Sequence, residues 1–204
     1  SYLILPRIVE LRDKYGVNVN FKLVYPLAIR EPEFFKGKNL FTFFLSITFD
    51  LKKQAKKHNM KFASPKPDPI NQNMLTGKIS DHQPYIFKLC HFCQAIEKNK
   101  QLDFALEVSK LIFGGFKGWN TDESISNVTS ILGLDFFDIE KNRLQNEQAL
   151  VDEIMENQKD QLEAGHHGVP LSVYKDKFFF GQDRFDDLIE ELKKDGLVFN
   201  KSSD

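Results

Sequence analysis

Hydrophobic and polar positions in the first part of the chain predict one helix followed by one strand. Residues 1–14 carry apolar side chains at helical spacing with charged residues between them. Gly16 is suited to end this helix, because glycine readily takes the left-handed conformation found there. Residues 17–25 alternate between apolar and polar side chains, which is typical of a strand with one buried face. Residues 25–38 then read as a loop with charges of both signs.

The middle of the chain is predicted to be helical. Residues 40–58 form a long amphipathic pattern, rich in phenylalanine at its start and in lysine at its end, which the helix macrodipole favours. Three prolines then force an extended linker over residues 61–72. Further helical patterns cover residues 84–98, 102–116, 123–132 and 145–164. Thr121 or Asp122 is expected to cap the start of the third of these, and Gly133 to end it.

Two short apolar runs near the end of the chain predict a β-hairpin. Residues 171–174 and 177–180 are partly β-branched or aromatic, and the polar pair between them suits a tight turn. Pro170 stands before the first strand, where a proline removes one backbone donor and is able to take the cis form beside a groove. Asp183 is expected to cap the last helix, which shows apolar residues at helical spacing.

Composition narrows the class of protein. With 204 residues, 41% hydrophobic and 28% charged, the chain fits a soluble globular protein. The net charge of −1 gives no support for binding to nucleic acid or to an anionic membrane. No apolar run approaches the roughly 20 residues that span a bilayer, and no signal peptide is visible. Two cysteines do not make a secreted disulfide scaffold, so a cytoplasmic location is expected. Twenty phenylalanines against one tryptophan indicate a large core rich in phenylalanine.

The motifs around the hairpin resemble a known family. Gly168-Val169-Pro170, the hairpin and then Gly181-Gln182-Asp183-Arg184 are similar to the signature of 2-hydroxychromene-2-carboxylate isomerases and kappa-class glutathione transferases. Both groups belong to the DsbA-like branch of the thioredoxin fold. The resemblance implies an α/β chain with a thioredoxin-like sheet and a large all-helical insertion. Residues 1–30 and 150–204 would form the thioredoxin-like domain, and residues 39–145 the helical insertion domain.

The same resemblance implies a cofactor, glutathione, and its binding residues. Val169–Pro170 would be a cis peptide whose Val169 backbone pairs with the cysteinyl part of glutathione. Gln182 and Asp183 would hold the glutamyl end. Ser1 and Tyr2 would lie in the first turn of the first helix, where free N–H groups and the positive dipole end favour a thiolate. An ordinary helix cap is an equal alternative for Ser1.

The catalytic residue cannot be assigned from this sequence. In the family that the chain resembles, a serine that activates glutathione lies three residues before the position of Ser1. A cysteine takes that place in disulfide oxidoreductases. We therefore expect the nucleophile-position residue and the first core strand of the fold to be missing from the chain.

The loop before residue 40 supplies weaker candidates for binding substrate. Arg30 could hold a carboxylate of the substrate or of glutathione in bidentate fashion, or pair at the surface with a neighbouring glutamate, Glu31 or Glu33. Lys38 and Asn39 are candidates because related proteins use a lysine and an asparagine from this segment. His166 and His167 precede the cis-proline motif, either as proton donors near the groove or as rim residues.

Cys90 and Cys93 have the spacing of a redox dithiol, but they lie in the middle of an apolar helical pattern. A thiol there gains little from the helix dipole, so two buried core cysteines are the better interpretation. The sequence shows no second cysteine pair for a metal site. Trp119 is expected to anchor the core.

The resemblance implies an enzyme: a glutathione-dependent isomerase of the 2-hydroxychromene-2-carboxylate isomerase type. Thiol addition to an enone, rotation about the former double bond and elimination would convert a small aromatic-derived substrate. A DsbA-like thiol–disulfide oxidoreductase and a non-catalytic thioredoxin-fold binding protein remain alternatives. No nucleic-acid or membrane partner is expected, and a homodimer is consistent with the resemblance.

Overall fold

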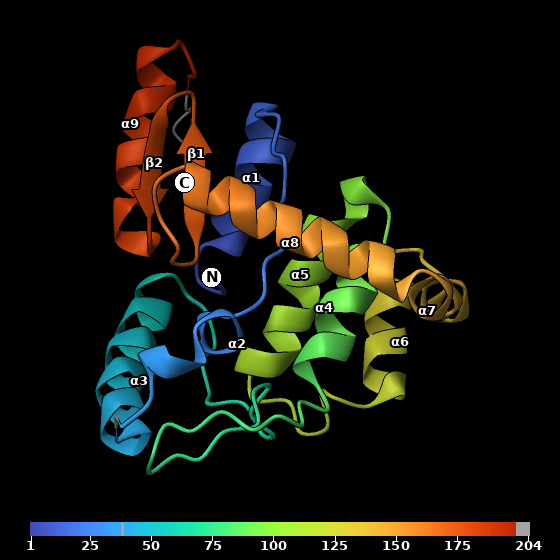
Figure 1. The fold of residues 1–204 in the computed structure, drawn as a ribbon. Coiled ribbons are helices and arrows are strands. Elements are labelled where there is room, and N and C mark those ends of the chain that lie inside the picture. The colour runs from blue at the N-terminus through green and yellow to red at the C-terminus, as the bar shows by residue number, and fades with distance from the viewer. Residues whose placement is uncertain (38, 199–204) are drawn as a thin grey trace.

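The computed structural model describes residues 1–37 and 39–198 of the chain. Figure 1 shows a β-hairpin with α9 and α1 at one end, a group of helices, α4 to α7, at the other, and α8 running between them. The elements in chain order are α1 Leu5–Tyr15, α2 Leu27–Arg30, η1 Pro32–Phe34, α3 Leu40–Lys57, α4 Ile86–Ala95, α5 Lys98–Phe113, α6 Asp122–Ile131, α7 Phe136–Gln145, α8 Glu147–Glu163, β1 Leu171–Tyr174, β2 Lys177–Phe180, η2 Gln182–Arg184 and α9 Phe185–Lys194.

The predicted hairpin is confirmed. β1 and β2 pair antiparallel with Leu171 opposite Phe180, and the two-residue turn has Lys175 at a φ of 55°. One face of the hairpin packs on α9 and α1 through a buried cluster that joins both ends of the chain: Ile4, Leu11, Phe179, Phe185, Leu188 and Leu192. Gly16 ends α1 at a φ of 66°, as predicted.

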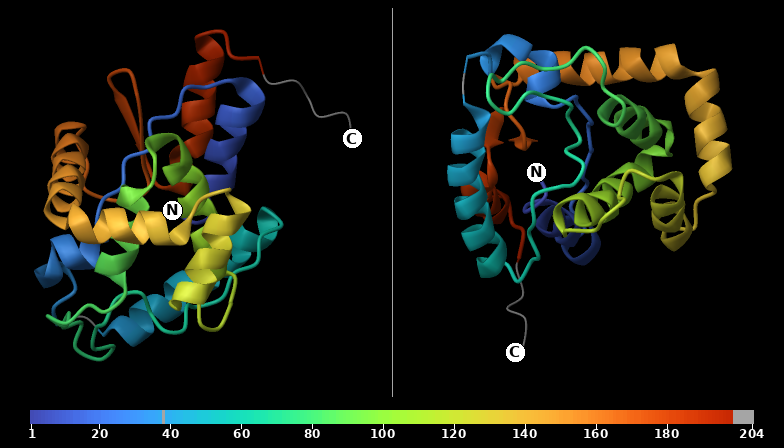
Figure 2. Two further views of the ribbon diagram at one scale, coloured as in Figure 1. Left: turned by 90° about the vertical axis from the view of Figure 1, so that its right-hand side faces the viewer. Right: turned by 90° about the horizontal axis from the view of Figure 1, so that it is seen from below.

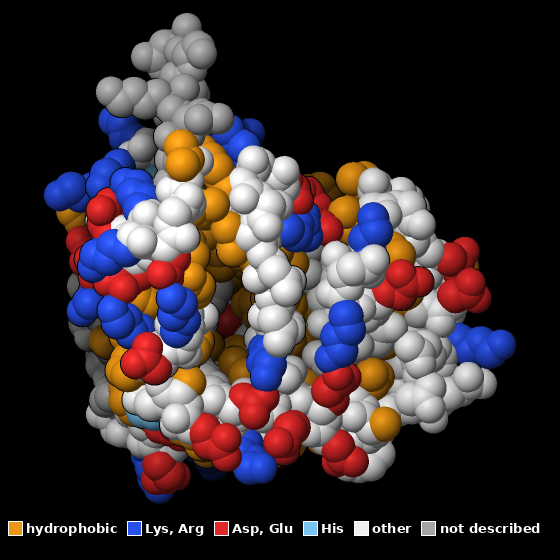
Figure 3. All heavy atoms as spheres, turned by 90° about the horizontal axis from the view of Figure 1, so that it is seen from above, with side chains coloured by type: hydrophobic (Ala, Val, Ile, Leu, Met, Phe, Trp, Pro, Cys, Tyr) orange, Lys and Arg blue, Asp and Glu red, His pale blue; other side chains and the backbone are white. Residues whose placement is uncertain are grey.

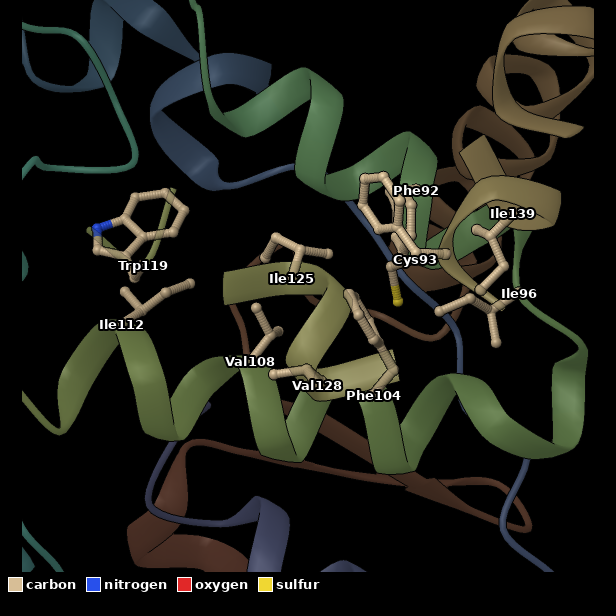
Figure 4. Close-up of a cluster of buried hydrophobic side chains, with 11 residues drawn as sticks. Phe92, Cys93, Ile96, Phe104, Val108, Ile112, Trp119, Ile125, Val128 and Ile139 are labelled. Atoms are coloured by element: carbon tan, nitrogen blue, oxygen red, sulfur yellow. The ribbon is translucent and has the colours of Figure 1, made fainter. Parts of the chain in front are cut away.

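A second and larger core lies among the helices of the middle of the chain. Figure 4 shows Phe104, Val108 and Ile112 along one side of α5, meeting side chains from α4, α6 and α7. Phe104 is fully buried, and Trp119 is 1% exposed with its indole N–H donating to the carbonyl of Pro67 at 2.9 Å. The prediction that Trp119 anchors the core is therefore confirmed.

Several predicted helix boundaries shift by a few residues. α1 begins at Leu5 and not at residue 1, with a proline in its first turn, and residues 1–4 form a turn ahead of it. Thr121 caps α6 as predicted, since its side chain accepts from the backbone N–H of Ser124. The pattern assigned to residues 145–164 is α8, and the separate helix α7 before it was missed. α7 exposes Phe137 and Leu144, which obscures its apolar face in the sequence.

The predicted strand over residues 17–25 is wrong. This segment is extended but pairs with no strand among the described residues. Phe21 and Leu23 pack against buried clusters of the core. Side chains of α8 meet its backbone: Asn157 donates to the carbonyl of Leu23 at 2.9 Å, and Gln158 accepts from the N–H of Tyr25 at 3.2 Å. Alternation in the sequence therefore reflected alternating burial, not a ladder of backbone hydrogen bonds.

The expectation of a core rich in phenylalanine holds only in part. Buried phenylalanines anchor both clusters, but others are largely exposed on the part of the chain that the structure describes. These are Phe34, Phe41, Phe43, Phe49, Phe116, Phe137, Phe178 and Phe180. Within residues 1–37 and 39–198, no helix is long and apolar enough to cross a membrane.

The contact of Asn157 with residues 17–25 makes a stability prediction. We expect Asn157→Ala to lower the free energy of unfolding by about 1–3 kcal/mol, because the Leu23 carbonyl loses its partner in a largely buried place. Urea denaturation measures the change. Gln148→Ala, an exposed change in the same helix, is the control and should stay within about 0.5 kcal/mol of the parent protein. Equal effects of the two variants would contradict this role for Asn157.

Candidate functional site

The cis-proline loop lies between α8 and β1. Val169–Pro170 is a cis peptide, so that prediction is confirmed. Neighbouring elements hold the carbonyls on both sides of Val169: Gln161 of α8 donates to Gly168 at 2.7 Å, and the N–H of Gly181 donates to Pro170 at 2.9 Å. No hydrogen bond among the described residues engages the backbone N–H or C=O of Val169. Val169 itself is 38% exposed, so the residue is in part accessible from solvent.

Gly168 is required by close packing. A Cβ atom there would stand 2.2 Å from Cε2 of Phe180 and 2.8 Å from Cε1 of His166. The His166 ring stacks on Phe180 with centroids 4.0 Å apart, and its Nδ1 accepts from the N–H of Gly168 at 2.8 Å. His166 therefore serves the shape of the loop, a role that the sequence pattern did not reveal.

Gln182 lies just past the end of the hairpin, as the first residue of η2. The hydrogen bond from the N–H of Gly181 to the carbonyl of Pro170 joins the residues that come directly before Gln182 and directly after Val169 in the sequence. The side-chain oxygen Oε1 of Gln182 is buried and has no hydrogen-bond partner in the described part of the chain. A buried acceptor without a donor is costly, so a ligand donor there would be favourable.

Asp183 does not cap the last helix, which corrects the prediction. It lies within η2, and the residue that precedes α9 is Arg184, with no side-chain cap. The hydrophobic residues begin only at Phe185, so one more turn separates Asp183 from the helix. Its exposed carboxylate has no partner among the described residues, whereas the neighbouring Arg184 pairs with Asp187.

Arg30 ties the cis-proline loop to the segment before α2. Its Nε donates to the carbonyl of Tyr25 and its Nη2 to the carbonyl of His167, each at 2.7 Å. Burial lowers the pKa of Arg30, although a guanidinium stays charged at neutral pH. The alternative for Arg30, a surface ion pair with Glu31 or Glu33, is wrong, because Glu31 pairs with Nδ1 of His167 at 2.8 Å and Glu33 pairs with Lys36 at 2.7 Å. Binding of a substrate carboxylate by Arg30 stays a prediction.

The start of the chain differs from expectation in detail. The N-terminal end lies beside the start of β1 in the views of Figures 1 and 2. Ser1 is exposed and is not the helix cap, since Ile4 holds that position. Tyr2 is buried, stacks on Phe113, and donates its hydroxyl to the carbonyl of Lys61 at 2.8 Å. That hydroxyl is therefore already engaged within the protein.

Two candidates from the loop before α3 have different outcomes. Lys38 lies outside the described residues. Asn39 caps α3: its Oδ1 accepts from the N–H groups of Phe41 at 3.1 Å and Thr42 at 3.3 Å. This explains the residue by helix capping. A contact of Asn39 with substrate stays a prediction.

The cysteine pair is buried in α4, as expected for core residues. Burial raises the pKa of Cys90 to about 12 and raises that of Cys93 as well. Between them, His91 is 6% exposed; its Nε2 lies 2.6 Å from the hydroxyl of Tyr25 and its Nδ1 3.2 Å from Glu147. Burial lowers the pKa of His91 and raises that of Tyr25 to about 12, so both are neutral near pH 7.

Two hollows lie near the hairpin. Figure 3 shows one with hydrophobic side chains in its walls, opening beside the charged face that α9 and the hairpin form. Another, of about 500 Å³, lies against β2 and α9 and contains none of the predicted site residues. Its charged walls are largely paired within the protein, for example Lys177 with Glu191. The described residues include no cluster of histidine, cysteine or acidic side chains that could hold a metal ion.

The fold is thioredoxin-like, of the DsbA-like type with a helical insertion. It matches a solved structure of selenomethionine 2-hydroxychromene-2-carboxylate isomerase with a TM-score of 0.72 and 17% sequence identity, over 95% of this chain and 89% of that one. The fold expected from the motifs is thereby confirmed. No protein-family model matches the chain, and neither does any curated protein sequence. At this identity the match shows the fold, and the activity has to be argued from the site.

The bridge made by Arg30 predicts a loss of stability on substitution. Lysine is expected to satisfy one carbonyl but not both, because it lacks the planar fork of the guanidinium. We expect Arg30→Lys to lower the free energy of unfolding by about 1.5–3 kcal/mol in urea denaturation. Arg184→Lys, which alters an exposed pair, is the matched control and should change little. A stable Arg30→Lys variant would show that the bridge does not hold the loop.

Burial of Cys90 and Cys93 predicts inert thiols. A folded-state pKa near 12 for Cys90 leaves almost no thiolate at pH 8, and rising pH favours the unfolded chain, whose thiols ionise near pH 8.5. We expect a disulfide-exchange reagent to react with neither thiol in the folded protein at pH 8 and with both in guanidinium chloride. Rapid reaction in the native state would reopen the dithiol interpretation.

Proposed function

We propose that the chain is a glutathione-dependent isomerase of the 2-hydroxychromene-2-carboxylate isomerase type. The observation that carries the proposal is the backbone of Val169, just before the start of β1, which makes no hydrogen bond with any described residue. An extended peptide adds to such an edge through main-chain hydrogen bonds. The fold shared with a solved isomerase of that name supports the same class of reaction.

The free polar groups around the loop fit glutathione. The N–H and C=O of Val169 would pair with the cysteinyl residue. The buried Oε1 of Gln182 would accept from the α-amino group of the glutamyl end, and the exposed carboxylate of Asp183 would neutralise its charge. The acceptor of Gln182 and the anion of Asp183 would match the ammonium group of glutathione, and the peptide edge at Val169 would match its extended backbone.

Glutathione would supply the thiolate that adds to an enone and leaves after bond rotation. The protein's part is to bind and orient. The N-terminal end of α1 carries the positive end of the helix dipole, which would favour a negative sulfur near Ser1. Arg30 fixes the loop that carries Val169, and hydrophobic walls beside the hairpin would exclude water from a small aromatic-derived substrate.

The buried, high-pKa thiols argue against Cys90 and Cys93 as the redox pair of a thiol–disulfide oxidoreductase. A thioredoxin-fold protein that binds a thiol peptide without catalysis is the second candidate, since the open edge at Val169 would serve it equally. The division into domains, a homodimer and a cytoplasmic location belong to the same proposal.

Calorimetric titration of glutathione tests the site. We expect binding to the parent protein and a loss of roughly 1–3 kcal/mol of binding free energy in Asp183→Ala, because a charged hydrogen-bond partner is removed. Asp187→Ala is the matched control: this exposed carboxylate lies four residues on and already pairs with Arg184.

Turnover of an aromatic enone in the presence of glutathione then separates the two candidates. Binding with turnover supports the isomerase, and binding without it supports a thiol-peptide binding protein. Absence of glutathione binding to the parent protein would refute both, and equal weakening in the two aspartate variants would move the site away from Asp183.

A further inference from the structure

One face of α3 carries a stripe of exposed hydrophobic side chains. Phe41, Leu45 and Phe49 are 60%, 64% and 73% exposed, and they follow one another at intervals of four residues. Residues at this spacing lie on the same side of a helix. Leu75, 72% exposed, comes from the loop next to the start of α3, where the N–H of Phe41 donates to the carbonyl of Met74 at 3.1 Å. An exposed apolar patch of this kind marks a contact surface.

The same helix ends in a positively charged segment. Its sequence contains four lysines and one aspartate, and all four lysines lie in the last two turns. Lys52, Lys53 and Lys56 are exposed and form no ion pair with any described residue. About half of the lysines outside α3 pair with acids, as Lys159 does with Glu156 and Lys177 with Glu191. The stripe and the lysines therefore offer a surface that is apolar and cationic at once.

The position of α3 leaves this surface accessible. The helix lies along the outer edge of the molecule in Figure 1 and in the right-hand view of Figure 2. Its inner side is held by Leu40 and Ala55, which are 0% and 1% exposed, and by the cap at Asn39. The outward side chains are thus not needed for packing against the rest of the chain.

We propose that α3 is an interfacial helix that binds the surface of a membrane containing anionic phospholipid. Phe41, Leu45 and Phe49 would enter the boundary between headgroups and acyl chains. The lysines would remain at headgroup level, with their alkyl stems along the apolar boundary and their ammonium groups on the phosphates. Each lysine near an anionic leaflet adds to the attraction. The helix would lie on the bilayer, consistent with the finding that no described helix is able to span it.

Charge favours lipid over a second copy of this chain. Two copies joined through this face would bring two lysine clusters into one interface, and like charges there disfavour association. An anionic surface complements the cluster instead. The overall net charge of −1, which gave no reason to expect such binding, conceals this asymmetry, because α3 has four lysines and one aspartate while acidic residues slightly outnumber basic ones in the rest of the chain.

Flotation with lipid vesicles tests the proposal. We expect the protein to float with phosphatidylcholine vesicles that contain phosphatidylserine, to float much less with phosphatidylcholine alone, and to lose binding as salt rises. The double variant Leu45→Gln, Phe49→Gln should reduce partitioning by about tenfold or more, since two anchoring side chains are lost. Lys52→Gln with Lys53→Gln should abolish the preference for phosphatidylserine.

Matched controls come from α7. Phe137 is 77% exposed, about as much as Phe49 at 73%. Phe137→Gln therefore controls for loss of a surface phenylalanine. Lys141→Gln controls for loss of an exposed lysine, and circular dichroism verifies folding of each variant. Failure of the parent protein to float, or equal losses in Phe137→Gln and the α3 variants, overturns the proposal. So does a dimer in sedimentation equilibrium that Phe49→Gln dissociates without any binding to vesicles. Because glutathione binding is not measured here, these outcomes are independent of the isomerase proposal.

Discussion

The candidate site depends on the fixation of three carbonyl groups around the cis-proline. The carbonyl of His167 is held by Arg30 of α2, that of Gly168 by Gln161 of α8, and that of Pro170 by the N–H of Gly181. Two neighbouring parts of the chain and one distant residue, Arg30, thus set one short loop. Buried backbone groups normally find partners, whereas Val169, between the held carbonyls of Gly168 and Pro170, has no backbone partner among the described residues. The loop is rigid where the protein holds it and open at Val169.

A buried polar network extends from this loop into the helices. Arg30 also binds the carbonyl of Tyr25, whose hydroxyl meets His91, and His91 in turn meets Glu147 at the start of α8. The lowered pKa of His91 and the raised pKa of Tyr25 keep both neutral at pH 7, so the network carries hydrogen bonds without burying a charge on either ring. Its role is to fix the orientation of the loop relative to α4 and α8.

Local rules were sufficient where the chain makes its own contacts. The two apolar runs with a polar pair between them determine the hairpin, and Thr121 and Gly16 act as helix ends through their own side chain or backbone freedom. The Val169–Pro170 peptide followed from the family resemblance. Contacts between distant residues could not be predicted in this way. Arg30 binds the carbonyl of His167, which is 137 positions away, and Asn157 of α8 binds the carbonyl of Leu23, which is 134 positions away. Such pairs are determined by the final packing of the chain.

An amphipathic pattern shows which face of a helix is apolar, but it does not show what covers that face. In α9 the apolar residues Phe185, Leu188 and Leu192 pack against the hairpin, so the apolar face of this helix is buried in a core cluster. In α3 a weaker amphipathic pattern leaves Phe41 and Phe49 in solvent, because the rest of the described chain supplies no surface for them. Apolar area that folding leaves exposed keeps its driving force for association. The lysines that follow the stripe then determine which surface complements it, and an anionic bilayer meets both requirements of α3 at once.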